Sequence, residues 1–166
     1  MTTALTHGGP VAVPDVPAYL SVAQRFWGAV PVVELPYHPG YGFLVAPLGF
    51  LSGDALHTAA LCVNAILTGI VVWMVQRLVR RSEAPQWVLW CSTAISVLHP
   101  SISHTSRVAW PETLLVVLLL SIGLCVTSLH TQKWYTAGLL AGLAPLVHPR
   151  AVVLAASVLF LGWFTG

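Results

Sequence analysis

The sequence predicts an all-α membrane protein: a polytopic bundle of transmembrane helices that follows an amino-terminal extracytoplasmic loop with short interfacial helices. Three observations predict this class. The chain of 166 residues is 57% hydrophobic and only 7% charged, with a mean hydropathy of +0.82, whereas about 25% of residues are charged in a soluble domain. Its longest apolar run exceeds the roughly 20 residues that cross a bilayer. That run ends in Arg77, Arg80 and Arg81, which mark a cytoplasmic loop by the positive-inside rule.

Residues 1–54 are predicted to form the extracytoplasmic loop. Within Asp15–Trp27, apolar residues recur at helical spacing and predict a short amphipathic helix along the membrane interface. These residues are Tyr19, Val22, Ala23 and Phe26. Asp15, followed by Pro17, marks the start of the helix, where its side chain is expected to cap free backbone N–H groups. Gly42–Leu51 is apolar but too short to span the bilayer, so a re-entrant or juxtamembrane helix is expected there.

Residues 55–166 are predicted to form the transmembrane bundle, with about four to five spans of roughly 20 residues each. The clearest span is Ala55–Val79. Shorter apolar runs predict the others, at Pro85–Leu98, Glu112–Leu129, Trp134–Val147 and Ala151–Phe164. The last two runs are short, so tilt or bilayer thinning is expected. The tripeptide from His148 to Arg150 is predicted to make a turn between them, and one long helix kinked at Pro149 is the alternative.

Counting spans from the arginine loop assigns a side to each polar residue. Residues 1–54 and 99–111 are placed outside, and Lys133 is placed inside. The charged residues placed outside are Asp15, Glu34, Arg107, Glu112 and Arg150. A membrane protein that keeps its acids and arginines at one interface usually does its chemistry there. The formal net charge of +2 indicates no nucleic-acid partner, and the arginine loop is expected to meet anionic lipid headgroups.

Asp15 is the leading candidate for catalysis. A carboxylate at the membrane surface beside Tyr19 could accept the proton of an acceptor hydroxyl, or bind a metal ion. The alternative is that Asp15 only caps its helix, and the two roles are compatible. Asn64, inside the longest apolar run, is expected to hydrogen-bond between helices as a structural residue. The three cysteines lie in apolar runs without metal-binding spacing and are interpreted as packing residues.

Two further regions carry charge near the ends of spans. Arg107 could bind a phosphate bidentately, and Glu112 at a helix start is stabilised by the helix dipole; an ion pair between these two residues is the alternative. Arg150 lies beside His148 at a break between apolar runs, where it either snorkels to the interface or meets an anion. His104 in the outer loop could bind phosphate or metal, or could simply be solvated.

Four segments occur in an order that carries a resemblance. They are DVPAYLSVAQRFW (Asp15–Trp27), YHPGYGFLVAPLGFLSGD (Tyr37–Asp54), SRVAWPETLLVVLLL (Ser106–Leu120) and GLLAGLAPLVHPRAVVL (Gly138–Leu154). Together they cover most of the chain, and as an ordered set the sequence resembles the amino-terminal half of a GT-C class integral membrane glycosyltransferase. The resemblance is to the actinobacterial type that depends on polyprenyl-phosphate sugars and serves the cell envelope.

This resemblance implies a reaction and a role for several residues. The family transfers a sugar from a polyprenyl-phosphate donor to an acceptor on the extracytoplasmic side of the bacterial plasma membrane. Asp15, in the pattern D-x-x-x-Y-x-x-x-A, matches the catalytic acid of the first outer loop and would remove the acceptor proton. Arg107 or Arg150 would stabilise the leaving lipid phosphate. The substrate-binding residues implied are Tyr19, His104, Arg107, Glu112, His148 and Arg150.

The resemblance also implies a cofactor and partners. A divalent cation, Mg²⁺ or Mn²⁺, is a candidate cofactor. Val16 stands where the usual motif has a second acid, so no residue is assigned as a metal ligand. The family's first span and carboxy-terminal half have no counterpart in this sequence, so a second membrane chain that supplies helices is an expected partner. The other expected partners are the lipid bilayer and the polyprenyl-phosphate-linked sugar.

Two other functions compete with the transferase. The first is a non-catalytic membrane subunit, or a truncated homologue, that packs on a partner membrane protein. The second is a small transporter component in which His99, His104 and Glu112 form a proton relay. Transporters place such groups near the bilayer midplane, whereas these three lie near the ends of predicted spans.

Overall fold

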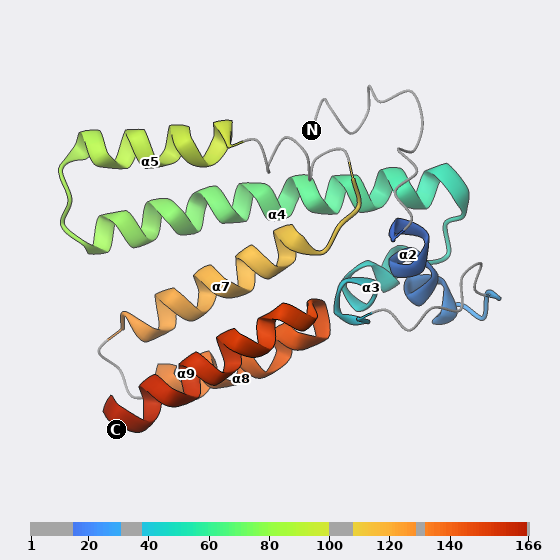
Figure 1. Cartoon of the computed structure of the whole chain (residues 1–166). Helices are drawn as coiled ribbons and strands as arrows, with labels where there is room; N and C mark the ends of the chain where they lie inside the picture. The colour runs from blue at the N-terminus through green and yellow to red at the C-terminus, as the bar shows by residue number, and fades with distance from the viewer. Residues whose placement is uncertain (1–14, 31–37, 100–107, 129–131, 166) are drawn as a thin grey trace.

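The computed structural model describes residues 15–30, 38–99, 108–128 and 132–165, and all regular structure within these ranges is helical (Figure 1). The predicted all-α class is therefore confirmed for the described residues. The elements in chain order are α2 (Val16–Arg25), α3 (Gly40–Val45), η1 (Ala46–Leu48), α4 (Gly53–Arg81), α5 (Gln86–Leu98), α7 (Glu112–Val126), α8 (Gln132–Val147), η2 (Pro149–Ala151) and α9 (Val152–Thr165).

The longest helix, α4, organises the bundle. Its 29 residues extend over about 44 Å at the rise of an α-helix. It packs against α5 and α7, α7 packs against α8, and α8 packs against α9. Among the described helices, α4 is the one that is long and apolar enough to cross a membrane, whereas the helical segments in α5, α7, α8 and α9 are apolar but shorter. Each predicted span is thus helical, and its length is shorter than a standard span in all cases but one.

Local sequence explains where the bundle helices begin and end. α5 follows Pro85 and α7 follows Pro111, because proline has a helical φ and lacks the N–H that a helix start leaves unpaired. α4 ends on two arginines, whose charge favours the carboxyl end of a helix dipole. Arg81 also donates to the carbonyl oxygen of Leu124 at 2.6 Å and to Thr127 Oγ1 at 3.2 Å. These bonds tie the end of α4 to the end of α7.

The predicted turn between the last two helices is confirmed, and the alternative of one kinked helix is wrong. α8 ends at Val147, and His148 has an extended backbone with φ of −153° and ψ of 134°. The His148 ring accepts a hydrogen bond at Nδ1 from the backbone N–H of Arg150 at 3.2 Å, which caps η2. The chain then reverses, and α9 packs back on α8.

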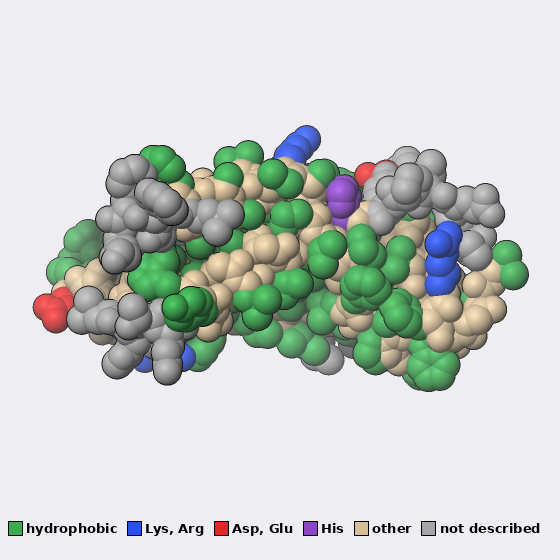
Figure 2. Space-filling model, turned by 90° about the horizontal axis from the view of Figure 1, so that it is seen from below, with side chains coloured by type: hydrophobic (Ala, Val, Ile, Leu, Met, Phe, Trp, Pro, Cys, Tyr) green, Lys and Arg blue, Asp and Glu red, His purple; other side chains and the backbone are tan. Residues whose placement is uncertain are grey.

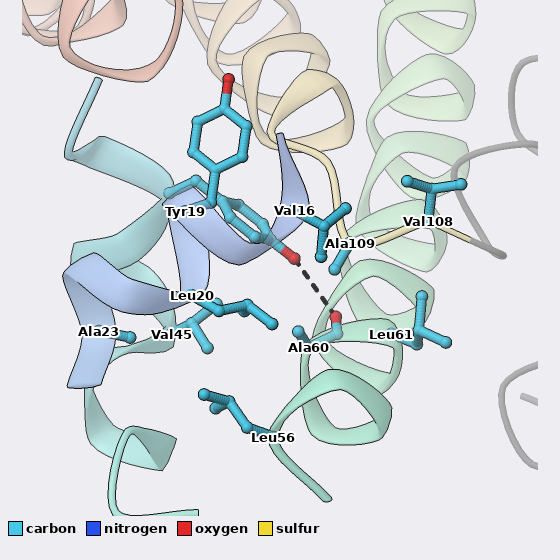
Figure 3. Packing of buried hydrophobic residues seen from close by; sticks show 11 residues of the cluster. Val16, Tyr19, Leu20, Ala23, Val45, Leu56, Ala60, Leu61, Val108 and Ala109 are labelled. Carbon is cyan, nitrogen blue, oxygen red and sulfur yellow. Dashed lines mark hydrogen bonds between the residues drawn. The ribbon is translucent and has the colours of Figure 1, made fainter. Parts of the chain in front are cut away.

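Two short helices, α2 and α3, cover one end of the bundle, and we call residues 15–30 and 38–51 the outer layer. Figure 1 shows this layer at the end where α4 begins and where α8 passes into α9. Within the layer, α2 packs on α3 and η1, and α3 also contacts α8. Its core joins the start of α4 and the segment before α7 in one buried cluster (Figure 3), made of Val16, Tyr19, Leu20, Ala23, Tyr41, Val45, Leu56, Ala60, Leu61, Val108 and Ala109.

The buried face of α2 shares two of its four positions, Tyr19 and Ala23, with the predicted face. The core side chains are those at 16, 19, 20 and 23, whereas the prediction ran on to Phe26, which lies beyond the end of α2 and is 59% exposed. The close approach of α3 sets this register. A Cβ placed on Gly42 would lie 2.5 Å from Cβ of Val22, so α3 meets this side of α2 only because glycine has no side chain.

Apolar side chains also cover much of the outside of the bundle. Figure 2 shows hydrophobic atoms across the face in view, with few charged atoms between them. Ile66 on α4, Trp90 on α5, Leu139 on α8 and Val153 on α9 are each more than 60% exposed. Helices that are apolar on their outer as well as their inner faces are typical of a lipid environment.

Candidate functional site

A buried polar pair lies where the outer layer meets α4. The side chains of Tyr41 and Asn64 are both fully buried. The Tyr41 hydroxyl donates to Asn64 Oδ1 at 3.0 Å. The carbonyl oxygen of Ala60 is a second, longer acceptor at 3.4 Å, and Figure 3 shows this bond as a dashed line to Ala60. The Asn64 amide donates to the carbonyl oxygens of Val108 and Trp110, both at 3.2 Å. The prediction that Asn64 links helices is confirmed, because it joins α3, α4 and the segment that leads into α7.

Electrostatics keep this pair neutral. Burial raises the pKa of the Tyr41 phenol above its ordinary value of 10.0, and the nearby negative charge of Glu112 raises it further. The ring of Tyr19 packs edge-on against the Tyr41 ring, with centroids 6.0 Å apart and planes at 83°. Tyr41 is therefore a hydrogen-bonding anchor rather than an acid or base at ordinary pH.

Asp15 lies at the start of α2, as predicted, but its side chain makes no capping hydrogen bond to the helix. The prediction that it caps α2 is wrong. The physical reason is its backbone, which is already helical with φ of −82° and ψ of −24°, whereas a capping side chain folds back from an extended residue. Tyr19 is buried in the core of the outer layer, so its predicted contact with substrate would need that core to open.

Glu112 begins α7, as predicted, and its position in the first turn suits a negative charge. Its Oε2 atom is buried and has no hydrogen-bond partner among the described residues. The next residue, Thr113, is 6% exposed, and its Oγ1 also lacks a partner there. The predicted ion pair of Glu112 with Arg107 and the proposed role of His104 fall outside the described residues.

Both unpartnered atoms belong to residues that line a cleft of about 370 Å³ between α4, α5 and α7. Its polar lining lies where α5 ends and α7 begins, beside the middle of α4, and consists of Thr68, Ser96, His99, Glu112 and Thr113. Its deeper walls are apolar and consist of Val71, Val75, Ile95, Val116 and Leu120. A volume above roughly 300 Å³ is in the range of pockets that hold small organic ligands. The cleft therefore has the shape and polarity of a site for an amphiphilic molecule.

The turn after α8 brings His148 and Arg150 to the outer layer. A Cβ on Gly40 would lie 2.8 Å from Cγ2 of Val147, so the start of α3 rests on the end of α8, one residue before His148. The imidazole of His148 is engaged in capping η2, while Arg150 is exposed. Of the predicted charged residues that the structure describes, Asp15, Glu112 and Arg150 thus all belong to helix ends next to the outer layer.

Sequence reasoning missed Tyr41, Thr113 and the cleft. Tyr41 lies just before the short helix predicted at Gly42–Leu51, and the glycines on both of its sides are typical of close backbone packing. Thr113 follows Glu112 at a helix start, where a threonine has no distinctive sequence signal. The cleft depends on how α4, α5 and α7 pack, which no local pattern encodes.

Within the described ranges, no group of three or more His, Cys, Asp or Glu side chains is placed to hold a metal ion. The residues present there do not fit the divalent cation that the resemblance allowed, so the chemistry below uses none.

Comparisons with known proteins identify no family for this chain. No family model matches the chain, and neither the curated proteins nor the solved structures that were searched contain a match.

Proposed function

We propose that this chain is the amino-terminal part of a membrane-embedded glycosyltransferase of the GT-C class. The reaction transfers a sugar from a polyprenyl-phosphate donor to an acceptor hydroxyl on the extracytoplasmic side of the plasma membrane. The single observation that carries the proposal is the arrangement of charge. Asp15, Glu112 and Arg150 belong to three different helix ends around the outer layer, whereas Arg77, Arg80 and Arg81 lie toward the far end of α4.

The arginines at the opposite end of the bundle support the proposed orientation in the membrane, with the outer layer outside the cytoplasm. Arg77, Arg80 and Arg81 lie in the last turns of α4, and Arg81 is bonded to the end of α7. By the positive-inside rule, that end faces the cytoplasm and the outer layer faces out. The exposed apolar faces of α5, α8 and α9 support contact with lipid, or with a second membrane chain that supplies further helices. Spans as short as these are accommodated by local thinning of the bilayer or by association with further helices.

The proposed chemistry uses one base and one cation. The Asp15 carboxylate takes the proton of the acceptor hydroxyl as the acceptor oxygen forms a bond to the anomeric carbon of the donor. The bond between that carbon and the phosphate oxygen breaks, and polyprenyl phosphate leaves with the electron pair. Arg150, exposed beside the outer layer, stabilises the phosphate that leaves. General base catalysis of this kind contributes about 10²–10⁴ in rate.

The proposal is tested by the pair of variants Asp15→Asn and Asp54→Asn in membranes that hold the complete transferase. Asp54 is a matched control, because it is an exposed acid in the first turn of α4 at the same end of the bundle. Sugar transfer from a polyprenyl-phosphate donor should fall by at least about 10²-fold in the first variant and stay near normal in the second. Normal turnover by Asp15→Asn would remove Asp15 as the base.

A non-catalytic membrane subunit is the second candidate, favoured by one observation. Two residues that the resemblance assigns to substrate, Tyr19 and His148, are engaged in packing and in capping. If this candidate holds, neither aspartate variant changes transfer, and deletion of the chain lowers the amount of an assembled membrane partner.

A further inference from the structure

The cleft between α4, α5 and α7 holds two unmatched polar atoms. Glu112 Oε2 and Thr113 Oγ1 are buried and lack hydrogen-bond partners among the described residues, and both residues line the cleft. An unsatisfied buried polar atom costs about 1–3 kcal/mol, and most such atoms in folded proteins have a protein or water partner. Two such atoms on consecutive residues at the start of one helix, both lining the same cleft, indicate that a bound molecule completes this site.

The depth and lining of the cleft indicate the rest of that molecule. From Glu112 to Leu120 the cleft follows α7 over eight residues, which is about 12 Å at the rise of an α-helix. Facing walls are formed by Val71 and Val75 of α4 and by Ile95 of α5. All of these deeper side chains are aliphatic, so the buried part of the ligand is an apolar chain.

The hydrogen-bonding capacity of Glu112 Oε2 and Thr113 Oγ1 indicates the head group of the ligand. A carboxylate oxygen only accepts hydrogen bonds, whereas a threonine hydroxyl both donates and accepts. A ligand hydroxyl matches both atoms at once, because it donates to Glu112 Oε2 and accepts from Thr113 Oγ1. An anionic head would meet the Glu112 charge, and no lysine or arginine lines the cleft in the described part of the chain. An ammonium head can donate to both atoms, but it leaves the threonine proton without an acceptor, which a hydroxyl head supplies.

We infer that the cleft between α4, α5 and α7 binds a single-chain amphiphile with an uncharged hydroxyl head, which hydrogen-bonds to Glu112 and Thr113 while its alkyl chain lies between α4, α5 and α7. The polyprenyl phosphate is excluded as the occupant of this cleft by the same argument. The inference concerns binding alone and is tested without a sugar donor. Its failure would leave the proposed transfer reaction untouched, and failure of the transfer reaction would leave the cleft untouched.

The experiment uses the full chain in lipid nanodiscs and a decanol that carries a photoreactive diazirine near its methyl end. After irradiation, peptide mapping should find the label on the stretch from Val71 to Val75 or from Val116 to Leu120. Unlabelled decanol, decylamine, decyl phosphate and decane then compete with the probe. Decanol should compete best, because it alone matches both polar atoms.

Three variants and one control separate the head group from the chain. Thr113→Val keeps the size of the side chain and removes its hydroxyl, and Glu112→Gln removes the charge; each should weaken decanol binding about tenfold, the scale of one charge-assisted hydrogen bond. Val71→Trp fills the apolar part and should abolish labelling at intact polar residues. Glu83→Gln changes an exposed acid at the other end of α4 and should leave labelling unchanged.

Each outcome decides the inference. Stronger competition by decylamine than by decanol would show that the cleft prefers a cationic head group, and stronger competition by decyl phosphate would show that it prefers an anionic one. Either result would overturn the assignment of a hydroxyl head. Equal competition by decane, or unchanged binding in both polar variants, would reduce the labelling to unspecific contact with lipid. If a polar variant fails to fold, the head-group series on the unmodified chain together with Val71→Trp gives the same decision.

Discussion

Asn64→Ala is expected to destabilise the protein more than any other change of a single polar residue in α4. The buried amide takes part in three hydrogen bonds, one from Tyr41 and two to backbone carbonyls before α7. At roughly 0.5–1.5 kcal/mol of net stability for each bond, the loss is about 2–4 kcal/mol. The carbonyl oxygens of Val108 and Trp110 also lose a donor, which places the expected value in the upper part of this range.

Equilibrium unfolding in mixed detergent micelles, followed by circular dichroism, measures this loss. Gln76→Ala is the matched control, because Gln76 lies on the same helix and its Nε2 donates a hydrogen bond to Thr93 Oγ1 at 3.2 Å. Its expected cost is about 1 kcal/mol. The reasoning would be refuted if Asn64→Ala cost no more than Gln76→Ala, since the polar pair would then not hold the outer layer on the bundle.

The remaining predictions concern orientation, packing and pH. In a chain without its native cysteines, a cysteine in place of Ser52 should react with an impermeant reagent from outside and one in place of Ser82 should not, because these exposed residues flank opposite ends of α4; the reverse pattern would invert the topology. Gly42→Ala should cost about 1–3 kcal/mol through overpacking against α2, whereas Gly69→Ala, with open space at its Cβ, should cost nothing by thermal unfolding. Because the pKa of Tyr41 is raised in the folded state, its contribution to stability is complete below its ordinary value of 10.0 and is lost as pH rises above it. Tyr41→Phe should flatten the alkaline loss of stability, and an unchanged pH profile would contradict that assignment.

The sequence predicted the helices well because their ends are encoded locally. Pro85, Pro111 and the arginines of α4 each stop or start a helix by a short-range effect, and the observed bounds lie within a few residues of the predicted ones. The turn at His148 was predicted for the same reason. These features depend on backbone chemistry within one or two turns.

Features that depend on packing between helices were predicted poorly. The buried face of α2 shares two of its four positions with the predicted face, because the packing of α3 against this helix is not encoded in the residue spacing of α2 alone. Capping by Asp15 was expected from residue type, but the backbone of that residue is helical. Asn64 was assigned its structural role from sequence, yet its partner Tyr41 became visible only with α3 in place.

The bonds of Asn64 and Arg81 have a consequence for how the cleft between α4, α5 and α7 can change shape. Asn64 attaches α4 to the segment at the head of α7, and Arg81 attaches α4 to the tail of α7. These two attachments are 17 residues apart on α4, about 26 Å along its axis. Because α4 and α7 are held together at two distant points, they move as one rigid unit. In the described part of the chain, α5 packs against α4 and is joined to it by a side-chain hydrogen bond between Gln76 and Thr93. We therefore expect the cleft to widen by movement of α5 away from α4 and α7, while the spacing between α4 and α7 stays fixed.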